Sequence, residues 1–101
     1  MTAVDVTVRV ERDGWTADVT VTSVTSVTTT RHRVRISNAE HRRYGGGDVD
    51  SLVRRSFAFL LEREPNTSIL PEFSLGDIER YFPEYVTRIG TTDDGSAQGR
   101  P

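Results

Sequence analysis

Residues 2–21 alternate apolar and polar side chains on both sides of a central Asp13-Gly14 dipeptide, in the stretch TAVDVTVRVERDGWTADVTV. Strict alternation is typical of strands with one buried face. The Asp-Gly dipeptide favours a two-residue type I′ turn, which needs positive φ at both central positions. The stretch therefore predicts a β-hairpin in which Arg12 lies opposite Trp15.

The predicted register of this hairpin can be checked against the side chains that it pairs. On one face every apolar residue meets another apolar residue, as where Val8 faces Val19. On the other face Arg9 faces Asp18, a favourable cross-strand pair. A slip of one residue would move all the valines to the opposite face.

A third strand is predicted at RHRVRIS, residues 31–37, where one ring and two aliphatic side chains alternate with arginines. Pairing Val21 with Val34 joins its apolar face to that of the hairpin through a loop at residues 26–29. The result is a three-stranded antiparallel meander with one polar face and one face that needs a cover.

Helices are predicted to supply this cover. Ser37 and Glu40 have the spacing of a capping box, which predicts a short helix ending at Arg43. Asp48 has the features of an N-cap for a main helix over residues 49–63. The apolar side chains of this helix span an arc of roughly 200°, wide enough to need two packing partners.

The segment after the main helix is predicted to provide the second partner. Pro65 ends the main helix, and Ser74 with Asp77 forms another pair with capping-box spacing at the start of a short helix. Pro83 is expected at the first position of a further helix, which Gly90 ends.

Together these elements predict the fold class α+β. A three-stranded antiparallel meander, made of the N-terminal hairpin and a third strand, is covered on one face by a main helix and two short C-terminal helices. A chain of 101 residues holds one core of this kind, so residues 1–90 are predicted as a single domain. Residues 91–101 lack apolar periodicity and are predicted to be a disordered tail.

The stretch IERYFPEY, residues 78–85, joins the two short helices. Phe82 lies on the apolar face of both helices, so it is predicted to anchor the core, and Phe82→Ala is expected to cost roughly 3–5 kcal/mol. Tyr81 and Tyr85 are predicted to be exposed and are candidate partner-binding residues. Trp15, near the hairpin turn, has two open interpretations, a partner anchor or a lid on the end of the core.

A resemblance covers about a third of the chain, the stretch RRSFAFLLEREPNTSILPEFSLGDIERYFPEY. Through the spacing of FAFLLEREP, SIL and ERYFPEY it resembles a family of short, uncharacterised bacterial proteins. The resemblance implies a shared domain, and it assigns no functional residue.

All 13 basic residues are arginine, and seven of them lie in residues 31–55, where the net charge is +4. If these side chains converge, they would contact phosphates in the manner of a nucleic-acid-binding surface. The other interpretation is a solvated face whose charge prevents unwanted strand pairing. The candidates for nucleic-acid binding are Arg31, Arg33, Arg35, Arg42 and Arg43, with Arg54 and Arg55 on the main helix.

No catalytic, cofactor-binding or metal-binding residue is predicted, and the chain is not expected to be an enzyme. The glycine loop GGGDVDS has no lysine, and Asp48 and Asp50 would repel a phosphate. His32 and His41 lack the dense spacing of metal ligands, and there is no cysteine.

The sequence therefore predicts a cytoplasmic, non-enzymatic interaction module. It has no signal-peptide pattern and no apolar run of the roughly 20 residues that span a bilayer, so no membrane partner is expected. The partner is either another protein or a second copy, bound through the edge of the first strand, which is regular and free of proline. The alternative is an accessory nucleic-acid-binding protein that uses the arginine-rich strand face.

Overall fold

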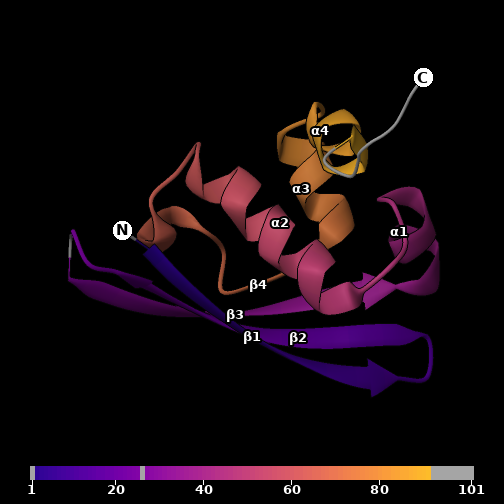
Figure 1. Cartoon of the computed structure of the whole chain (residues 1–101), viewed down its shortest axis with the longest axis horizontal. Helices are drawn as coiled ribbons and strands as arrows, with labels where there is room; N and C mark the ends of the chain where they lie inside the picture. The colour runs from indigo at the N-terminus through magenta and orange to yellow at the C-terminus, as the bar shows by residue number, and fades with distance from the viewer. Residues whose placement is uncertain (1, 26, 92–101) are drawn as a thin grey trace.

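The structure, a computed structural model, describes residues 2–25 and 27–91 and has two layers. All the helices lie on one face of a β-sheet (Figure 1). The predicted α+β class is therefore confirmed. In chain order the elements are β1 (Thr2–Glu11), β2 (Gly14–Ser23), β3 (Thr28–Ser37), α1 (Asn38–Arg43), α2 (Val49–Leu61), the 3-10 helix η1 (Asn66–Ser68), β4 (Glu72–Ser74), α3 (Leu75–Tyr81) and α4 (Tyr85–Thr91).

The sheet has four strands in the order β1-β2-β3-β4, so the predicted three-stranded antiparallel sheet was incomplete. The added strand, β4, runs parallel to β3 from the Arg33–Glu72 pair to the Arg35–Ser74 pair. It is fixed at its start by the Arg33 amide, which donates to the carbonyl of Pro71 at 2.8 Å. A strand of three residues is too short for alternation to reveal it in the sequence.

The hairpin forms, but its register differs by two residues from the prediction. Trp15 pairs with Val10, so Arg12 and Asp13 make the turn and Gly14 belongs to β2. Among the described non-glycine residues only Val27 has positive φ, so the turn lacks the backbone of type I′.

The reason for the shift is the close approach of β3 to Gly14. This residue has φ +154°, and a Cβ on it would lie 2.0 Å from the carbonyl oxygen of Ile36. The glycine is therefore required where two strands come together, and not in the turn itself.

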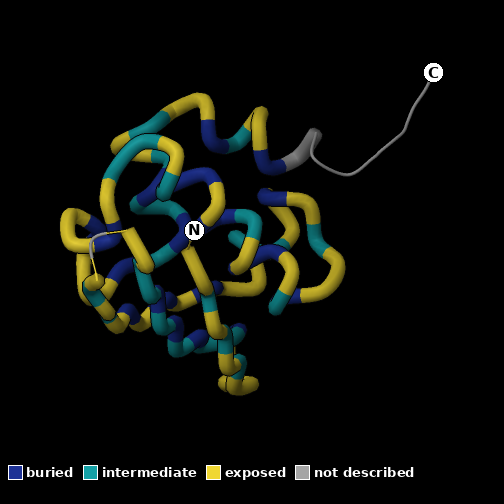
Figure 2. The backbone as a smooth tube through the Cα atoms, turned by 60° about the vertical axis from the view of Figure 1, so that its left-hand side comes forward, coloured by how far each residue is buried: buried dark blue, intermediate teal, exposed yellow. Residues whose placement is uncertain are grey.

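The register of β3 also differs, by four residues. Val34 pairs with Ala17, whereas Val21 pairs with Thr30. The reason is that β2 ends at Ser23 and β3 begins at Thr28, so the connection starts and ends two residues earlier than predicted. Both shifts are even, so each residue keeps its predicted face, and buried and less buried residues alternate along the strands (Figure 2).

Two predicted helix starts are confirmed by their caps. The Ser37 hydroxyl accepts from the amide of Glu40 at 3.0 Å, and the Glu40 carboxylate accepts from the amide of Ser37 at 3.0 Å. The Asp48 carboxylate accepts from the amide of Ser51 at 3.0 Å, and α2 follows. These caps are local hydrogen bonds, which is why residue spacing predicts them.

The C-terminal helices follow the prediction less closely. Ser74 and Asp77 form the expected capping box at the start of α3. However, α4 begins two residues after Pro83 and continues through Gly90 to Thr91, so the predicted stop at Gly90 was wrong. One glycine inside a helix costs only about 1 kcal/mol, which packing offsets.

The core lies between the inner face of the sheet and the helices. Its largest fully buried side chains include Tyr44, Phe57 and Tyr85. The predicted exposure of Tyr85 was wrong: as the first residue of α4 it points inward, and its ring lies 5.2 Å from that of Phe59. Phe82 is only partly buried, so the role of core anchor belongs to Tyr85.

The predicted C-terminal tail, residues 91–101, begins at the last residue of α4, and residues 92–101 lie outside the described residues. Within the described ranges, no helix combines the length and apolar character needed to cross a membrane.

Candidate functional site

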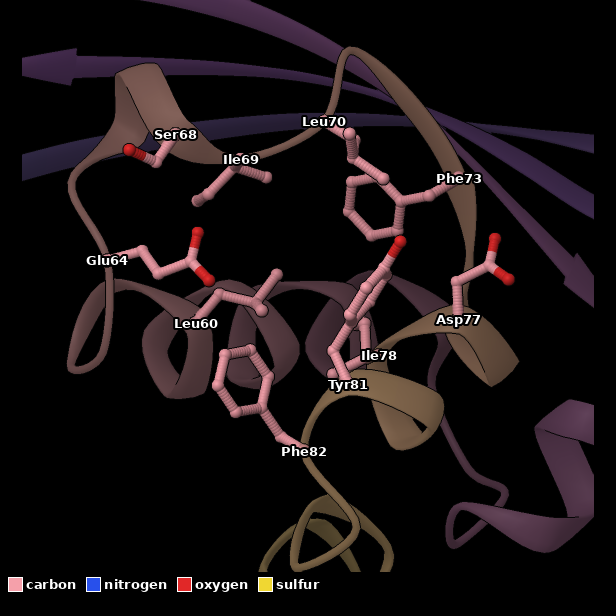
Figure 3. A pocket seen from close by; sticks show the side chains of 10 residues that line it. All are labelled: Leu60, Glu64, Ser68, Ile69, Leu70, Phe73, Asp77, Ile78, Tyr81 and Phe82. Carbon is pink, nitrogen blue, oxygen red and sulfur yellow. The ribbon is translucent and has the colours of Figure 1, made fainter.

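An open groove of about 240 Å³ lies between the end of α2, the connection that leads to β4, and α3 (Figure 3). Its base is apolar and consists of buried side chains from the two helices and from β4. These side chains are Leu60 from α2, Phe73 from β4 and Ile78 from α3.

Two exposed hydrophobic residues flank the groove. Leu70 is 47% exposed and Tyr81 is 67% exposed, and both line it together with the partly buried Phe82. Figure 3 shows Tyr81 and Glu64 reaching into the groove from different sides. The sequence predicted Tyr81 as a partner-binding residue, and the structure places it at this opening.

The charged side chains that line the groove are both acidic, Glu64 and Asp77. Asp77 is already engaged, since its carboxylate accepts from the amide of Ser74 at 3.0 Å and pairs with Arg80 at 3.5 Å. The Glu64 carboxylate has no ion pair with any residue in the described part of the chain. The groove therefore combines an apolar base with unneutralised negative charge.

The wall formed by the α2–β4 connection is held to the sheet by Asn66, a residue that is only 3% exposed. Its side-chain amide donates to the hydroxyl of Thr30 at 3.2 Å and to the carbonyl of Val21 at 3.5 Å. Its side-chain oxygen accepts from the hydroxyl of Thr28 at 3.2 Å. These bonds satisfy a buried polar group that would otherwise be costly.

His32 extends this set of bonds to the next part of the wall. Its Nδ1 lies 2.7 Å from the carbonyl of Leu70, and its Nε2 lies 2.8 Å from the hydroxyl of Thr30. Because a carbonyl only accepts, Nδ1 donates to Leu70, and in the neutral ring Nε2 then accepts from the Thr30 hydroxyl. We call the side chains of Thr28, Thr30, His32 and Asn66 the polar clamp. Residue spacing does not predict it, since Asn66 lies 38 and 36 residues from Thr28 and Thr30.

The other two candidate partner-binding residues lie away from the groove or inside the core. The Trp15 ring packs against that of His41 at 4.7 Å and is partly buried over the core, and it faces Val10 where Arg12 was predicted. Tyr85 is fully buried, so it offers no surface to a partner.

The Tyr85 hydroxyl lies 2.7 Å from the hydroxyl of Ser56, which lies 2.8 Å from the carbonyl of Leu52. Since that carbonyl can only accept, Ser56 donates to it and Tyr85 donates to Ser56. Burial raises the pKa of Tyr85 above its ordinary value.

The candidate arginines do not form one surface. Arg31, Arg33 and Arg35 project from the outer face of the sheet, whereas Arg54 and Arg55 belong to α2 on the other face (Figure 1). Several are paired with carboxylates: Arg33 with Asp18 at 3.2 Å, Arg35 with Glu72 at 2.7 Å, Arg43 with Glu79 at 2.6 Å and Arg54 with Asp50 at 2.5 Å. Arg31 and Arg42 make no ion pair with any described residue.

Glu79 connects α3 to the end of α1. Its carboxylate accepts two hydrogen bonds from Arg43, at 2.9 and 2.6 Å, and one from the hydroxyl of Tyr44, at 2.7 Å. The hydrogen bonds from Arg43, and after them the one from Tyr44, lower the pKa of Glu79 to about 2. Burial raises the pKa of Tyr44 to about 12, and the bond to Glu79 adds to this effect. At neutral pH the ionised Glu79 carboxylate therefore holds α3 to Arg43 and Tyr44 at the end of α1.

Within residues 2–25 and 27–91, no three histidine or carboxylate side chains are close enough together to hold a metal ion. Comparisons with protein-family models, with curated proteins and with solved structures gave no match to this chain. The resemblance of residues 54–85 to a bacterial family therefore stays a prediction.

Proposed function

We propose that the protein is a small interaction module whose groove beside Tyr81 binds a short segment of a partner protein. The observation that supports this most strongly is the apolar base of the groove, left open between the exposed side chains of Leu70 and Tyr81. Exposed apolar patches of this kind mark sites of association in soluble proteins. Aromatic residues such as Tyr81 also supply much of the binding energy at interfaces.

The dimensions of the groove limit what it can accept. Its volume of about 240 Å³ is below the roughly 300–1,000 Å³ typical of sites for small organic ligands and cofactors. The groove suits one or two apolar side chains of a segment that lies across the opening.

The charge of the groove adds a second requirement. Asp77 already has partners, but the Glu64 carboxylate has no ion pair with a described residue, so a segment with an arginine or lysine next to its apolar anchor gains a charge-assisted hydrogen bond to Glu64. A segment with an acidic neighbour is repelled. The proposed ligand is therefore a peptide with an apolar anchor and an adjacent basic residue.

Selection of displayed random peptides on the immobilised protein tests this proposal. We expect enrichment of sequences with an aromatic or aliphatic residue beside a basic one. The selected peptides should bind Tyr81→Ser at least about tenfold more weakly, as is usual when an interface anchor is truncated. Glu64→Gln should reduce the preference for the basic residue and keep the preference for the apolar anchor.

Val24→Ser is the control, because Val24 is an exposed apolar residue (62%) that does not line the groove. Unchanged binding by Tyr81→Ser would refute the proposed site.

The alternative, accessory nucleic-acid binding through the strand arginines, has less support. Arg33 and Arg35 already face carboxylates at 3.2 and 2.7 Å, which lowers the positive charge available to phosphates. A mobility-shift assay at low salt tests it. Binding that is lost in Arg33→Glu and Arg35→Glu would favour this alternative over the peptide-binding module.

A further inference from the structure

The β1 strand forms one edge of the described sheet, so a row of its backbone hydrogen-bonding groups points away from β2 and is not paired with another strand. The carbonyl of Val4 accepts from Nη1 of Arg54 at 2.8 Å, so it points away from β2. Because backbone directions alternate along an antiparallel strand, the groups of Val6, Val8 and Val10 point to the same free edge. Any strand that adds here must pair with these valines.

We propose that two copies of the chain form a dimer by antiparallel pairing of their β1 strands about Thr7. In this register Thr7 faces Thr7 of the second copy, and Val6 faces Val8 of the second copy. Asp5 then faces Arg9 of the second copy, and symmetry repeats each pair on the other side. The edge-facing valines are brought opposite each other, as the hydrogen-bonding pattern of an antiparallel ladder requires.

The charge pattern of β1 selects this register among the alternatives. A shift of two residues removes both Asp5–Arg9 pairs, and in one direction it places Asp5 against Glu11. A shift of four residues places Asp5 against Asp5 or Arg9 against Arg9. Like charges directly opposite each other destabilise a strand pair, so among these registers the one centred on Thr7 is the one that pairs opposite charges.

Some β1 side chains that would lie in the dimer interface are exposed or lack an ion-pair partner among the described residues of the single chain. Val10 is 82% exposed although it lies on the inner face of the sheet, and in the dimer it meets Val4 of the second copy. The Asp5 carboxylate makes no ion pair with any residue that the structure describes. Arg9 lies 3.4 Å from Asp18, on the same face, and can be shared between that carboxylate and Asp5 of the second copy.

Pairing requires one local change, at the Arg54 side chain. The carbonyl of Val4 would exchange its bond with Arg54 for one from the amide of Val10 of the second copy. Arg54 would keep its ion pair with Asp50, which lies one helical turn earlier on α2. The groove lies beside β4, at the opposite edge of the sheet, so this dimer is independent of the peptide-binding proposal.

Reversing the charge of Asp5 or of Arg9 tests the register. The mass of the protein in solution is measured for each variant at low salt, where ion pairs are least screened. The unmodified chain is expected to form dimers. Asp5→Arg and Arg9→Asp should each weaken dimerisation roughly tenfold or more, because each change puts two like-charge pairs at the interface. An equal mixture of the two variants should form a heterodimer, since both pairs are then complementary.

The proposal would be overturned if either single variant dimerised as strongly as the unmodified chain. It would also be overturned if the unmodified chain were monomeric at millimolar concentration.

Cross-linking gives a second measurement that does not depend on the charge variants folding. The natural chain has no cysteine, so Thr7→Cys introduces a single thiol on the proposed two-fold axis. Directly opposed residues of this kind come close enough for a disulfide, so oxidation should give a covalent dimer. Thr29→Cys, on the same sheet face but on β3, should remain monomeric. Equal cross-linking of the two variants would refute the β1 interface.

Discussion

The buried pair of hydroxyls on Ser56 and Tyr85 should behave as one energetic unit. Both side chains are fully buried, and their oxygens lie 2.7 Å apart. Tyr85→Phe removes the donor, while Ser56 keeps its bond to Leu52, so we expect a loss of about 1 kcal/mol in the free energy of unfolding. Ser56→Ala leaves the Tyr85 hydroxyl buried without its acceptor, so we expect a larger loss of about 2 kcal/mol.

The double variant Ser56→Ala/Tyr85→Phe distinguishes the loss of a hydrogen bond from a loss of packing. Removing both partners leaves no unsatisfied polar group, so it should cost about 1 kcal/mol, well below the sum of the single losses. Urea denaturation gives these free energies. In thermal unfolding each 1 kcal/mol should appear as a shift of roughly 4–8 °C for a domain of this size.

Tyr81→Phe serves as the control, because Tyr81 is exposed and should change stability by less than about 0.5 kcal/mol. A double variant that loses the full sum of the single losses would refute the assigned hydrogen bond.

The pH dependence provides an independent check on the same hydroxyl. Burial raises the pKa of Tyr85 above its ordinary value of 10.0, so the folded protein holds this proton more tightly than the unfolded chain. Stability from this group is fully present below pH 10 and declines as the pH rises above it. Tyr85→Phe should make the alkaline decline less steep than in the unmodified protein, and an unchanged slope would contradict the burial argument.

Three further outcomes follow from other contacts. Gly14→Ala should lower the free energy of unfolding by roughly 2–4 kcal/mol, because the new Cβ would collide with the carbonyl of Ile36. Gly46→Ala has open space around it and should lower it by about 1 kcal/mol, because of its positive φ. Equal losses in urea denaturation would argue against the collision. The lowered pKa of Glu79 gives stability that is present above pH 4.5 and is lost as the pH falls toward about 2. Glu79→Gln should therefore make the decline of the melting temperature at acid pH less steep. A decline identical to that of the unmodified protein would count against a structural role of the Glu79 carboxylate. Phe57→Ala, at a fully buried site, should cost roughly 3–5 kcal/mol and Phe82→Ala about half as much; a larger loss for Phe82→Ala would restore it as the core anchor.

The sequence predicted features that depend on neighbouring residues. The alternating faces of β1, β2 and β3 were correct because side-chain direction has a period of two along a strand. The Ser37 and Asp48 caps were correct because a cap joins residues three apart.

Features that depend on distant parts of the chain were missed. The predicted strand registers were wrong by an even number of residues, because such a shift exchanges one apolar cross-strand pair for another of similar energy. The close approach of Gly14 to Ile36 favours the observed register, and the pairing pattern of the sequence does not reveal it. Tyr85 replaced Phe82 in the core because the start of α4 sets the direction of its side chain. The polar clamp was missed because it joins β3 to a segment beyond α2.

The polar clamp also bears on the order in which the protein folds. Pairing of β1, β2 and β3 needs only short turns between successive strands, so this meander can form early. The bonds that join the α2–β4 connection to β3, between Asn66 and Thr30 and between His32 and Leu70, close loops of 36 and 38 residues. Loop closure costs entropy before any contact compensates for it. We therefore expect the sheet to form on the pathway before the groove does. A chain that has not finished folding would expose its β1 edge while it still lacks a groove.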